Sequence, residues 1–361
     1  MHGFLNISLE EIKSNWVALN DASEGKAAAV IKANSYGMGM IKIAKKLIEA
    51  GCSYFYVANL DEAINLRKKF TSKKISIAVF EGFFEGSELI YFKNKLTPII
   101  NNLEQLNRIN KFNIHEKKMN AILNIDTGMN RLGLSELEIT DILKKKDILK
   151  VTKWDFIMSH LANSNDKKNL ENYKQLIKIK KFSEAFPNIK LSLANTGGIK
   201  LGSKYCLDQT RPGIGLYGID NDGKNVKIKS QILKLPLELY APIIQVRDVS
   251  FGQPVSYGGI ETTKRKSKLA TIGIGYADGW LRLLKTNSTF SVKKQKCKII
   301  GNITMDSFIL DITNVNENNL KEGDYLCLLD NSNVSKIIKN LDIISYELLT
   351  SIGQRIIRKY S

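Results

Sequence analysis

The sequence has no long apolar run and few residues of the kinds that build metal or disulfide sites. No stretch of its 361 residues approaches the length of a transmembrane helix, so we expect no membrane span. The amino terminus has no basic segment followed by an apolar one, which indicates a protein without a secretory signal. The four cysteines are too far apart for a CxxC redox or zinc pair, and only three histidines accompany them. We therefore expect a cytoplasmic chain with reduced thiols and no metal site.

Arginine is also scarce, although the chain carries a formal net charge of +18. Nine of the 54 basic residues are arginine, and the lysines are spread over the whole chain. Proteins that read base edges favour arginine, and single-strand binders place aromatic residues among their basic ones; neither pattern is present. We therefore interpret the positive charge as a lysine-rich, solvated surface and expect no nucleic-acid partner.

The stretch AAVIKANSYGMG, residues 28–39, combines a buried-strand pattern with a lysine at its end. Its first residues are alanine and β-branched, which is typical of a strand buried on both faces. Lys32 follows directly, and the asparagine, serine and glycines after it favour a turn. Because partial burial lowers the cost of keeping an amine neutral, Lys32 could form a Schiff base with an aldehyde cofactor. An isolated strand-end lysine more often reaches solvent, so the interpretation of Lys32 depends on the rest of the chain.

Residues 8–230 alternate short apolar runs with amphipathic stretches, which is the pattern of repeated βα units. Two intervening segments, Met40–Ala50 and Leu60–Phe70, have apolar residues at helical spacing. Eight such units predict an α/β fold, a closed TIM-type (β/α)8 barrel with its functional side chains at the carboxyl ends of the strands. An open doubly wound sheet fits the same pattern, but it more often carries a GxGxxG fingerprint, which is missing. The predicted strands are Ala27–Lys32, Tyr54–Ala58, Ile75–Phe80, Thr97–Ile100, Met119–Asp126, Asp155–His160, Lys190–Ala194 and Ile214–Gly218.

The pattern changes after about residue 230, where short strand-like runs follow one another without a long helix. The one extended helical pattern in this part is Val334–Leu349. We therefore predict a mostly β second domain over residues 231–361, following the barrel domain over residues 8–230. Its predicted strands are Ile243–Val249, Lys268–Ile274, Thr289–Val292, Ile299–Thr304, Phe308–Ile312 and Tyr325–Leu329.

Motifs along the chain resemble those of alanine racemases, beginning with IKANSYGMG around Lys32, which is similar to the family's pyridoxal-phosphate lysine motif. They occur in family order from Lys32 to Arg355, and chance matching explains that order poorly. The resemblance implies a barrel that binds pyridoxal phosphate, residues 1–7 joined to the β-rich domain, and a homodimer with shared active sites. The further motifs are LDEA at 60–63, DTGMNRLG at 126–133, LANTGG at 193–198, RPGIGLYG at 211–218, VSYGG at 255–259, IGYADG at 274–279, ITMDSF at 303–308 and SYELLTSIGQR at 345–355.

The resemblance implies a two-base reaction, in which one group removes the Cα proton of an amino acid and another returns a proton to the opposite face. Lys32 would serve one face, and Tyr257 from the second subunit would serve the other. A phenol has a reference pKa of about 10, so Tyr257 needs neighbours that favour its phenolate. In the family a histidine and an arginine stand behind this tyrosine, and they correspond here to His160 and Arg211. Arg211 would also face the pyridine nitrogen of the cofactor, keep it neutral and so limit side reactions.

The remaining motif residues correspond to family positions that bind cofactor or substrate. Arg131 matches an arginine that orients the substrate carboxylate with its planar, bidentate fork. Met305 matches a residue whose backbone N–H binds that carboxylate from the partner subunit, and Tyr276 and Asp306 match positions that line the way into the site. The expected cofactor-binding residues besides Lys32 and Arg211 are Tyr36, Asn195, Thr196, Gly213, Ile214 and Tyr346.

Two positions depart from the family pattern. Many members carry a carbamate-modified lysine two residues before the DTGM aspartate, and Asn124 stands there in this chain. We expect no carbamate at this position. Because a neutral amide cannot hold Arg131 by charge, we expect a bound anion or water to take the place of the missing charge. Ser192 stands where the family often has a histidine, which weakens the expected hydrogen-bond chain around Arg211 without abolishing it.

We therefore expect an alanine racemase, a pyridoxal-phosphate-dependent isomerase that supplies D-alanine for peptidoglycan. A broader amino-acid racemase acting on serine or lysine is the main alternative, since none of these residues fixes the size of the substrate side chain. Pyridoxal decarboxylases share the order of barrel and β domain but fit less well with VSYGG and IGYADG. A non-catalytic pyridoxal-phosphate carrier resembles the barrel alone, so residues 231–361 argue against it.

Overall fold

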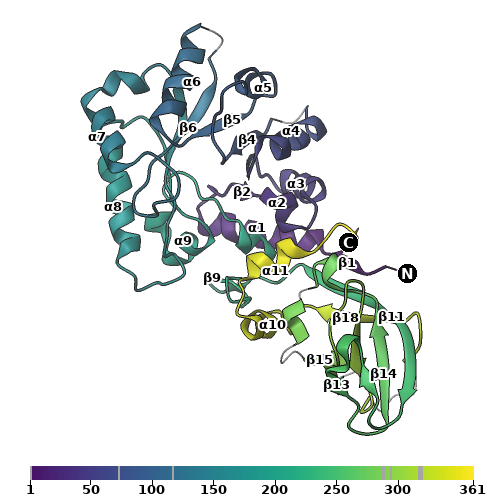
Figure 1. Cartoon of the computed structure of the whole chain (residues 1–361). Coiled ribbons are helices and arrows are strands. Elements are labelled where there is room, and N and C mark those ends of the chain that lie inside the picture. The colour runs from purple at the N-terminus through teal and green to yellow at the C-terminus, as the bar shows by residue number, and fades with distance from the viewer. Residues whose placement is uncertain are drawn as a thin grey trace.

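The computed structural model describes residues 2–71, 74–115, 118–280, 282–285, 289–292, 295–315 and 320–361. Figure 1 shows two parts, a barrel of parallel strands surrounded by helices and a β-rich part that contains both ends of the chain. The predicted fold class, a (β/α)8 barrel followed by a mostly β domain, is confirmed. None of the described helices is long and apolar enough to cross a membrane.

The barrel sheet contains seven parallel strands, which pair in sequence order from β2 to β8. Side chains that point inward from these strands, among them Tyr56, Ile99 and Phe156, pack against one another in the interior. This packing explains why the strands are nearly continuous apolar runs in the sequence. The strands are β2 (Ala29–Val30), β3 (Tyr54–Val57), β4 (Ser76–Val79), β5 (Thr97–Ile100), β6 (Asn120–Asn124), β7 (Lys153–Met158) and β8 (Leu191–Ser192).

The prediction of an eighth strand at Ile214–Gly218 is wrong. Residues Ile214–Tyr217 form a short 3-10 helix, η3, instead. The place between β8 and β2 is filled by residues 209–212, through parallel bridges to both neighbours. The N–H of Ala28 donates to the carbonyl oxygen of Thr210 at 2.9 Å, which closes the barrel.

Amphipathic helices cover the outside of the barrel. The predicted helices at 40–50 and 60–70 are confirmed as α3 and α4, and α3 buries Ile43 and Leu47 on one face. The barrel helices are α1 (Leu9–Ala22), α3 (Met40–Glu49), α4 (Leu60–Lys69), α5 (Glu88–Lys93), α6 (Leu103–His115), α7 (Glu136–Lys144), α8 (Glu171–Ser183) and α9 (Thr196–Leu201), and the short segment labelled α2 (Lys32–Tyr36) follows β2.

The β-rich part is built on one sheet with the strand order β15-β16-β17-β14-β11-β1-β19, and β18 also pairs with β11. Strand β1 at the amino terminus pairs with β11 and with β19 at the carboxyl terminus, so both chain ends belong to this sheet. The elements are β1 (Phe4–Ile7), β9 (Lys227–Ile228), β10 (Gln231–Ile232), β11 (Leu237–Val249), β12 (Pro254–Val255), β13 (Glu261–Thr262), β14 (Ser267–Ile272), β15 (Thr289–Val292), β16 (Gln295–Ile299), β17 (Phe308–Asp311), β18 (Tyr325–Leu329), α10 (Val334–Leu341), α11 (Ser345–Ser351) and β19 (Ile357–Tyr360).

Two predictions for this part are wrong. The strand expected at Ile299–Thr304 ends at Ile299, and the chain then turns at Gly301, whose φ is 74°. The helix expected at Val334–Leu349 is two helices, because Asp342 has a left-handed φ of 53° and ends α10. The break separates α10 from α11, which lies between the two parts of the molecule (Figure 1).

The carboxyl-terminal residues of the β-rich part reach the barrel segment that follows Lys32. The guanidinium of Arg358 donates to the carbonyl oxygen of Gly37 at 3.0 Å. The hydroxyl of Tyr360 donates to the carbonyl oxygen of Met38, also at 3.0 Å. These contacts join strand β19 to the turn at the end of β2.

Candidate functional site

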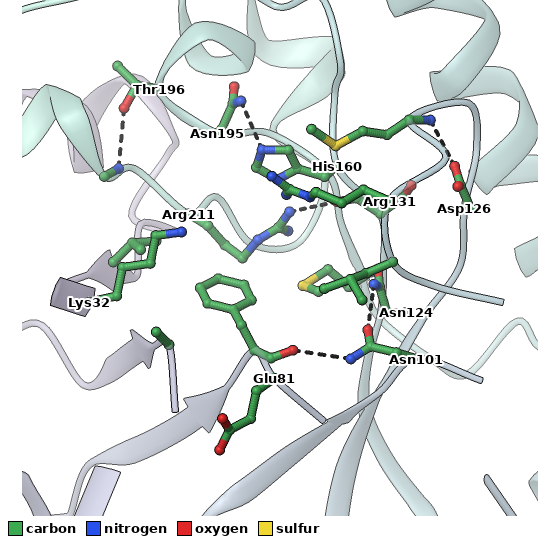
Figure 2. A pocket seen from close by; sticks show the side chains of 18 of the residues that line it. Lys32, Glu81, Asn101, Asn124, Asp126, Arg131, His160, Asn195, Thr196 and Arg211 are labelled. Atoms are coloured by element: carbon green, nitrogen blue, oxygen red, sulfur yellow. Dashed lines mark hydrogen bonds between the residues drawn. The ribbon is translucent and has the colours of Figure 1, made fainter. Parts of the chain in front are cut away.

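A cavity of about 580 Å³ opens at the carboxyl ends of the barrel strands. This is the end at which (β/α)8 barrels carry their functional groups. Figure 2 shows side chains from separate strands and loops converging on this space. The sequence-predicted residues that line it are Lys32, Tyr36, Arg131, His160, Asn195, Thr196, Arg211, Gly213, Ile214 and Tyr346.

Lys32 lies at the end of β2 and lines the cavity. Its Nζ is 5.6 Å from the centroid of the Phe80 ring. Burial lowers the pKa of the Lys32 amine and the charge of Arg131 lowers it further, whereas the carboxylate of Glu62 raises it. The net effect is an amine that loses its proton more easily than that of an ordinary lysine. An amine must be neutral to react with a carbonyl group, so this shift favours such a reaction.

The segment after Lys32, labelled α2 in Figure 1, is a left-handed turn. The φ angles of Ala33, Asn34, Ser35 and Tyr36 are 53°, 52°, 58° and 53°. This conformation costs L-residues roughly 1–2 kcal/mol each, so the turn depends on support from outside. Part of that support is a hydrogen bond between the Ser35 and Tyr217 hydroxyls, whose oxygens are 2.8 Å apart. The turn brings Lys32 and Tyr36 to the same cavity.

Arg211 is a buried cation, and one of its three nitrogens has no hydrogen-bond acceptor among the described residues. Its guanidinium donates to the carbonyl oxygen of Ser159 at 2.6 Å and to the hydroxyl of Ser192. Burial lowers the pKa of Arg211 to about 10, so the group stays charged at neutral pH. The Nε is buried and finds no acceptor among the described residues. Because an unpaired buried donor is costly, this atom marks a point where a bound molecule would supply an acceptor.

His160 lies beside Asn195, with 3.4 Å between its Nε2 and the amide nitrogen. Burial lowers the pKa of His160 to about 3, and the nearby charges of Arg211, Arg131 and Lys32 act in the same direction. The ring is therefore neutral at physiological pH. Within a single chain, burial first and the nearby cations second disfavour a charge on this ring, and the pairing of His160 with the Tyr257 phenolate stays a prediction.

The other end of the cavity is rich in hydroxyl groups. Burial raises the pKa of Tyr346 to about 12 and that of Tyr36 well above the usual value, so both phenols keep their protons. The hydroxyl of Thr196 accepts from the N–H groups of Gly213 and Gly215, at 3.3 and 3.1 Å. Protonated hydroxyls that converge on one space suit an anion such as a phosphate.

Asn124 takes part in a chain of amides at the floor of the cavity (Figure 2). Its Nδ2 donates to the Oδ1 of Asn101 at 2.8 Å, and Asn101 donates in turn to the carbonyl oxygen of Phe80 at 3.1 Å. Because the Phe80 carbonyl can only accept, it fixes the direction of both amides. The Oδ1 of Asn124 accepts no hydrogen bond from the described residues.

Four sequence-predicted residues lie outside this cavity, on the β-rich part. Tyr257, Met305 and Tyr276 are exposed, with 78%, 53% and 46% of their surface accessible. Asp306 accepts from the guanidinium of Arg355 at 2.8 Å. Within one chain the structure does not bring these residues to Lys32.

Sequence reasoning missed several residues of the site. Glu81, Phe80 and Asn101 line the cavity, and nothing in their local sequence distinguishes them from structural residues. Glu62 belongs to the LDEA motif, but the motif alone did not indicate what this residue contacts. The described residues contain no group of three or more histidine, cysteine, aspartate or glutamate side chains that could hold a metal ion.

Comparisons with known proteins agree over the whole chain. Residues 7–221 match the family model described as the alanine racemase N-terminal domain, and residues 236–360 match that of the C-terminal domain. An alanine racemase of Rickettsia bellii is 39% identical over 92% of this chain and 81% of its own length. One from Rickettsia rickettsii is 37% identical over 99% of this chain and 98% of its own.

A solved structure is also similar over its full length. The crystal structure of alanine racemase from Bartonella henselae, described with covalently bound pyridoxal phosphate, has a TM-score of 0.93 and 35% sequence identity, with 100% of each chain covered. The two family models, the full-length relatives and the similar solved structure therefore all indicate the same family. The chain belongs to the alanine racemase family.

Proposed function

We propose that this chain is a cytoplasmic alanine racemase, an isomerase that uses pyridoxal phosphate to interconvert L- and D-alanine and so supplies D-alanine for peptidoglycan. The observation that carries the proposal is the position of Lys32. Its amine of lowered pKa shares one cavity with two arginines, Arg131 and Arg211, and with the hydroxyls of Tyr36 and Tyr346. An amine, a cation for the substrate carboxylate, a second cation for the pyridine nitrogen and a hydroxyl-rich end are what an amino acid joined to this cofactor requires.

The residues present fit pyridoxal phosphate. The buried Nε of Arg211, which has no acceptor among the described residues, would donate to the pyridine nitrogen. The hydroxyls of Tyr36, Thr196 and Tyr346 would hold the phosphate, beside Gly213 and Ile214. A side chain at Gly213 would obstruct this end, since its Cβ would lie 2.3 Å from the Tyr36 hydroxyl oxygen. Lys32 would hold the aldehyde carbon, and Asn195 would keep His160 in place.

The chain's own groups account for the proton transfers. When bound, pyridoxal phosphate withdraws electrons from the Cα of an attached amino acid and makes its proton removable. Lys32 takes or returns that proton on one face, because its lowered pKa gives it a usable neutral form. Arg131 holds the substrate carboxylate, and Arg211 donates a hydrogen bond without giving up a proton. Because Arg211 keeps its proton, the pyridine nitrogen of a bound cofactor would stay neutral. A neutral nitrogen withdraws electrons from the substrate less strongly than a protonated one.

We infer that the second face is served by Tyr257 of a second copy of the chain, in a homodimer. Tyr276, Met305 and Asp306 would reach the same site, with Met305 contributing its backbone N–H. Large apolar side chains of the β-rich part are exposed, as Tyr257 is, which supports a surface covered by another protein. They are Ile244, Phe251 and Ile260, at 49%, 72% and 69% exposure. The division of the chain near residue 230, with residues 1–7 in the second domain, is supported by the pairing of β1 with β11 and β19.

The test is a substrate panel on the purified protein loaded with pyridoxal phosphate. We expect conversion of L-alanine to D-alanine, slower conversion of serine and lysine, and no release of carbon dioxide. Borohydride reduction should leave the cofactor attached to the peptide that contains Lys32. Decarboxylation, a preference for a larger amino acid, or attachment to another lysine would each contradict the proposal.

A further inference from the structure

The carboxylate of Glu62 connects the two chain segments that flank Lys32. Its Oε1 accepts from the N–H of Asn34 at 3.1 Å, and its Oε2 accepts from the N–H of Ala58 at 2.9 Å. Asn34 lies in the left-handed turn, and Ala58 follows strand β3, which pairs with β2. One side chain therefore ties the turn after Lys32 to the end of the adjacent strand.

The position of Glu62 is itself fixed by the helix to which it belongs. Glu62 lies in the first turn of α4, where its N–H donates to the side chain of the capping residue Asn59 at 3.0 Å. A negative side chain is favoured at this end of a helix. Hydrogen bonds from backbone N–H groups to a carboxylate are stronger than those between neutral groups. The carboxylate is thus held in place before it contacts Asn34 and Ala58.

The turn that Glu62 contacts cannot be held by local preference. Alanine, serine and tyrosine do not favour the left-handed region, yet Ala33, Ser35 and Tyr36 all occupy it. Strained backbone of this kind persists where the surroundings determine it, and it is common at functional sites. Glu62 is the one ionised side chain that hydrogen-bonds to a backbone N–H of this turn among the described residues.

Glu62 also contributes charge at Lys32. Its carboxylate raises the pKa of the amine, against the effects of burial and of Arg131. The other titratable groups that line the cavity with Lys32 are Tyr36, Glu81, Asp126, Arg131, His160, Arg211 and Tyr346. Two of these are arginines and two are carboxylates, but Glu62 is the carboxylate whose charge acts on the pKa of the Lys32 amine, where it opposes the charge of Arg131.

We propose that Glu62 is a positioning residue for Lys32, whose carboxylate braces the left-handed turn after the amine through the Asn34 and Ala58 N–H groups and also contributes its negative charge to the surroundings of the amine. The inference rests on the proposed function only in treating Lys32 as the reactive amine. No contact of Glu62 with cofactor or substrate is implied.

The test compares Glu62→Gln with Asp61→Asn in the full-length protein. Both variants remove one negative charge from the first turn of α4, but the exposed Asp61 side chain makes no hydrogen bond to the turn. The glutamine keeps one acceptor and turns its NH2 group towards the other N–H. In the cofactor-free protein we expect hydrogen exchange at the Asn34 and Ala58 amides to be about tenfold faster in Glu62→Gln than in wild type. Asp61→Asn should match wild type.

A second readout follows the charge. Removing the carboxylate lowers the pKa of the Lys32 amine, so its reaction with an acylating reagent, followed by mass spectrometry of the Lys32 peptide, should shift to lower pH in Glu62→Gln. Glu62→Asp keeps the charge but can reach only one of the two N–H groups. It should speed amide exchange less and leave the pH profile near that of wild type. In the cofactor-loaded enzyme we expect kcat to fall about tenfold in Glu62→Gln, with KM changed less than about threefold.

Equal amide exchange in Glu62→Gln and Asp61→Asn would overturn the brace, and equal pH profiles would overturn the charge effect. If Glu62→Gln does not fold, the exchange rates of Glu62→Asp decide between the same outcomes. Neither the exchange rates nor the acylation profile depends on racemase activity. A wild-type protein that fails to racemise alanine would therefore contradict the proposed function and leave this test intact.

Discussion

Ser192 accepts a hydrogen bond from the buried guanidinium of Arg211 and donates one to the carbonyl oxygen of Gln209, 2.9 Å away. This serine thus links Arg211 to the segment that closes the barrel between β8 and β2. A buried cation needs acceptors because its hydration has been removed. The contact couples the closure of the barrel to the residue expected to face the pyridine nitrogen of the cofactor.

Replacing this serine should therefore destabilise the protein. Ser192→Ala removes an acceptor from Arg211, and we expect the free energy of unfolding to fall by about 1–3 kcal/mol in urea denaturation. Ser53→Ala, at an exposed serine whose side chain has no hydrogen-bond partner among the described residues, is the control and should change it by less than about 0.5 kcal/mol. Equal destabilisation by the two variants would show that the Ser192 contact carries little energy.

Gly213 and Tyr36 cannot both keep their positions if residue 213 gains a side chain. The φ of Gly213 is −118°, which is outside the left-handed region that favours glycine, but an added Cβ would lie 2.3 Å from the Tyr36 hydroxyl oxygen. We expect Gly213→Ala to displace Tyr36 and to weaken pyridoxal-phosphate binding by about tenfold or more, measured by absorbance titration.

A double variant separates this collision from other effects. Tyr36→Phe removes the colliding oxygen, and the next ring atom would then be 3.3 Å from the new Cβ. The stability lost in Tyr36→Phe/Gly213→Ala should accordingly be smaller than the sum of the single losses, with a coupling of about 0.5–3 kcal/mol. Additive losses would mean that the two residues do not compete for space.

The low pKa of His160 leads to a prediction of how the free energy of unfolding depends on pH. Its pKa is about 3 in the folded chain, whereas an unfolded histidine titrates near 6.5. Between these values the unfolded chain binds a proton that the folded chain does not, so the contribution of His160 is present above about pH 6.5 and is lost as the pH falls. In the cofactor-free protein, wild type should lose about 1–2 kcal/mol more than His160→Gln between about pH 7 and pH 5. Parallel pH curves from urea denaturation would contradict a neutral buried His160.

Because residue 124 is an asparagine, we expect the racemisation rate not to depend on carbon dioxide. A side-chain amide is not nucleophilic enough to form a carbamate, and its nitrogen is already bonded to Asn101 at 2.8 Å. We expect no added mass on the peptide that contains Asn124 and no change in racemisation rate when bicarbonate is added or removed. A bicarbonate-dependent rate, reversed on degassing, would contradict this prediction.

The elements that the sequence predicted well are those determined by local pattern. Lys32 was expected at the exit of a buried strand because an apolar β-branched run ends there, and it lies there. The prediction of a strand at Ile214–Gly218 was wrong because the glycines there allow close packing. An added Cβ at Gly215 would lie 2.7 Å from the Thr196 methyl group. Apolar residues alternating with glycine fit a strand equally well, so the pattern alone could not decide.

Other features depend on contacts between distant segments. No local propensity predicts left-handed backbone at Ala33, Ser35 and Tyr36, because that turn is held by residues such as Glu62 and Tyr217. Asn101 and Asn124 are 23 positions apart, and only the barrel brings them within 2.8 Å. Resemblance supplied the candidate residues of the site. Their electrostatics, such as the low pKa of His160, depend on burial and then on neighbouring charges, which only the three-dimensional structure brings together.

The distance between Tyr257 and the barrel cavity within one chain leads to a complementation test. Lys32→Ala and Tyr257→Phe should each lack one of the two proton-transfer groups and show little racemisation alone. If Tyr257 acts in the partner's site, a mixed dimer of the two variants contains one site with both wild-type groups and one with neither. With free exchange of subunits, an equal mixture should regain about a quarter of wild-type activity, since half of the dimers are mixed and half of their sites are intact. If Tyr257 served its own chain, every site in the mixture would keep one defect and no activity would return.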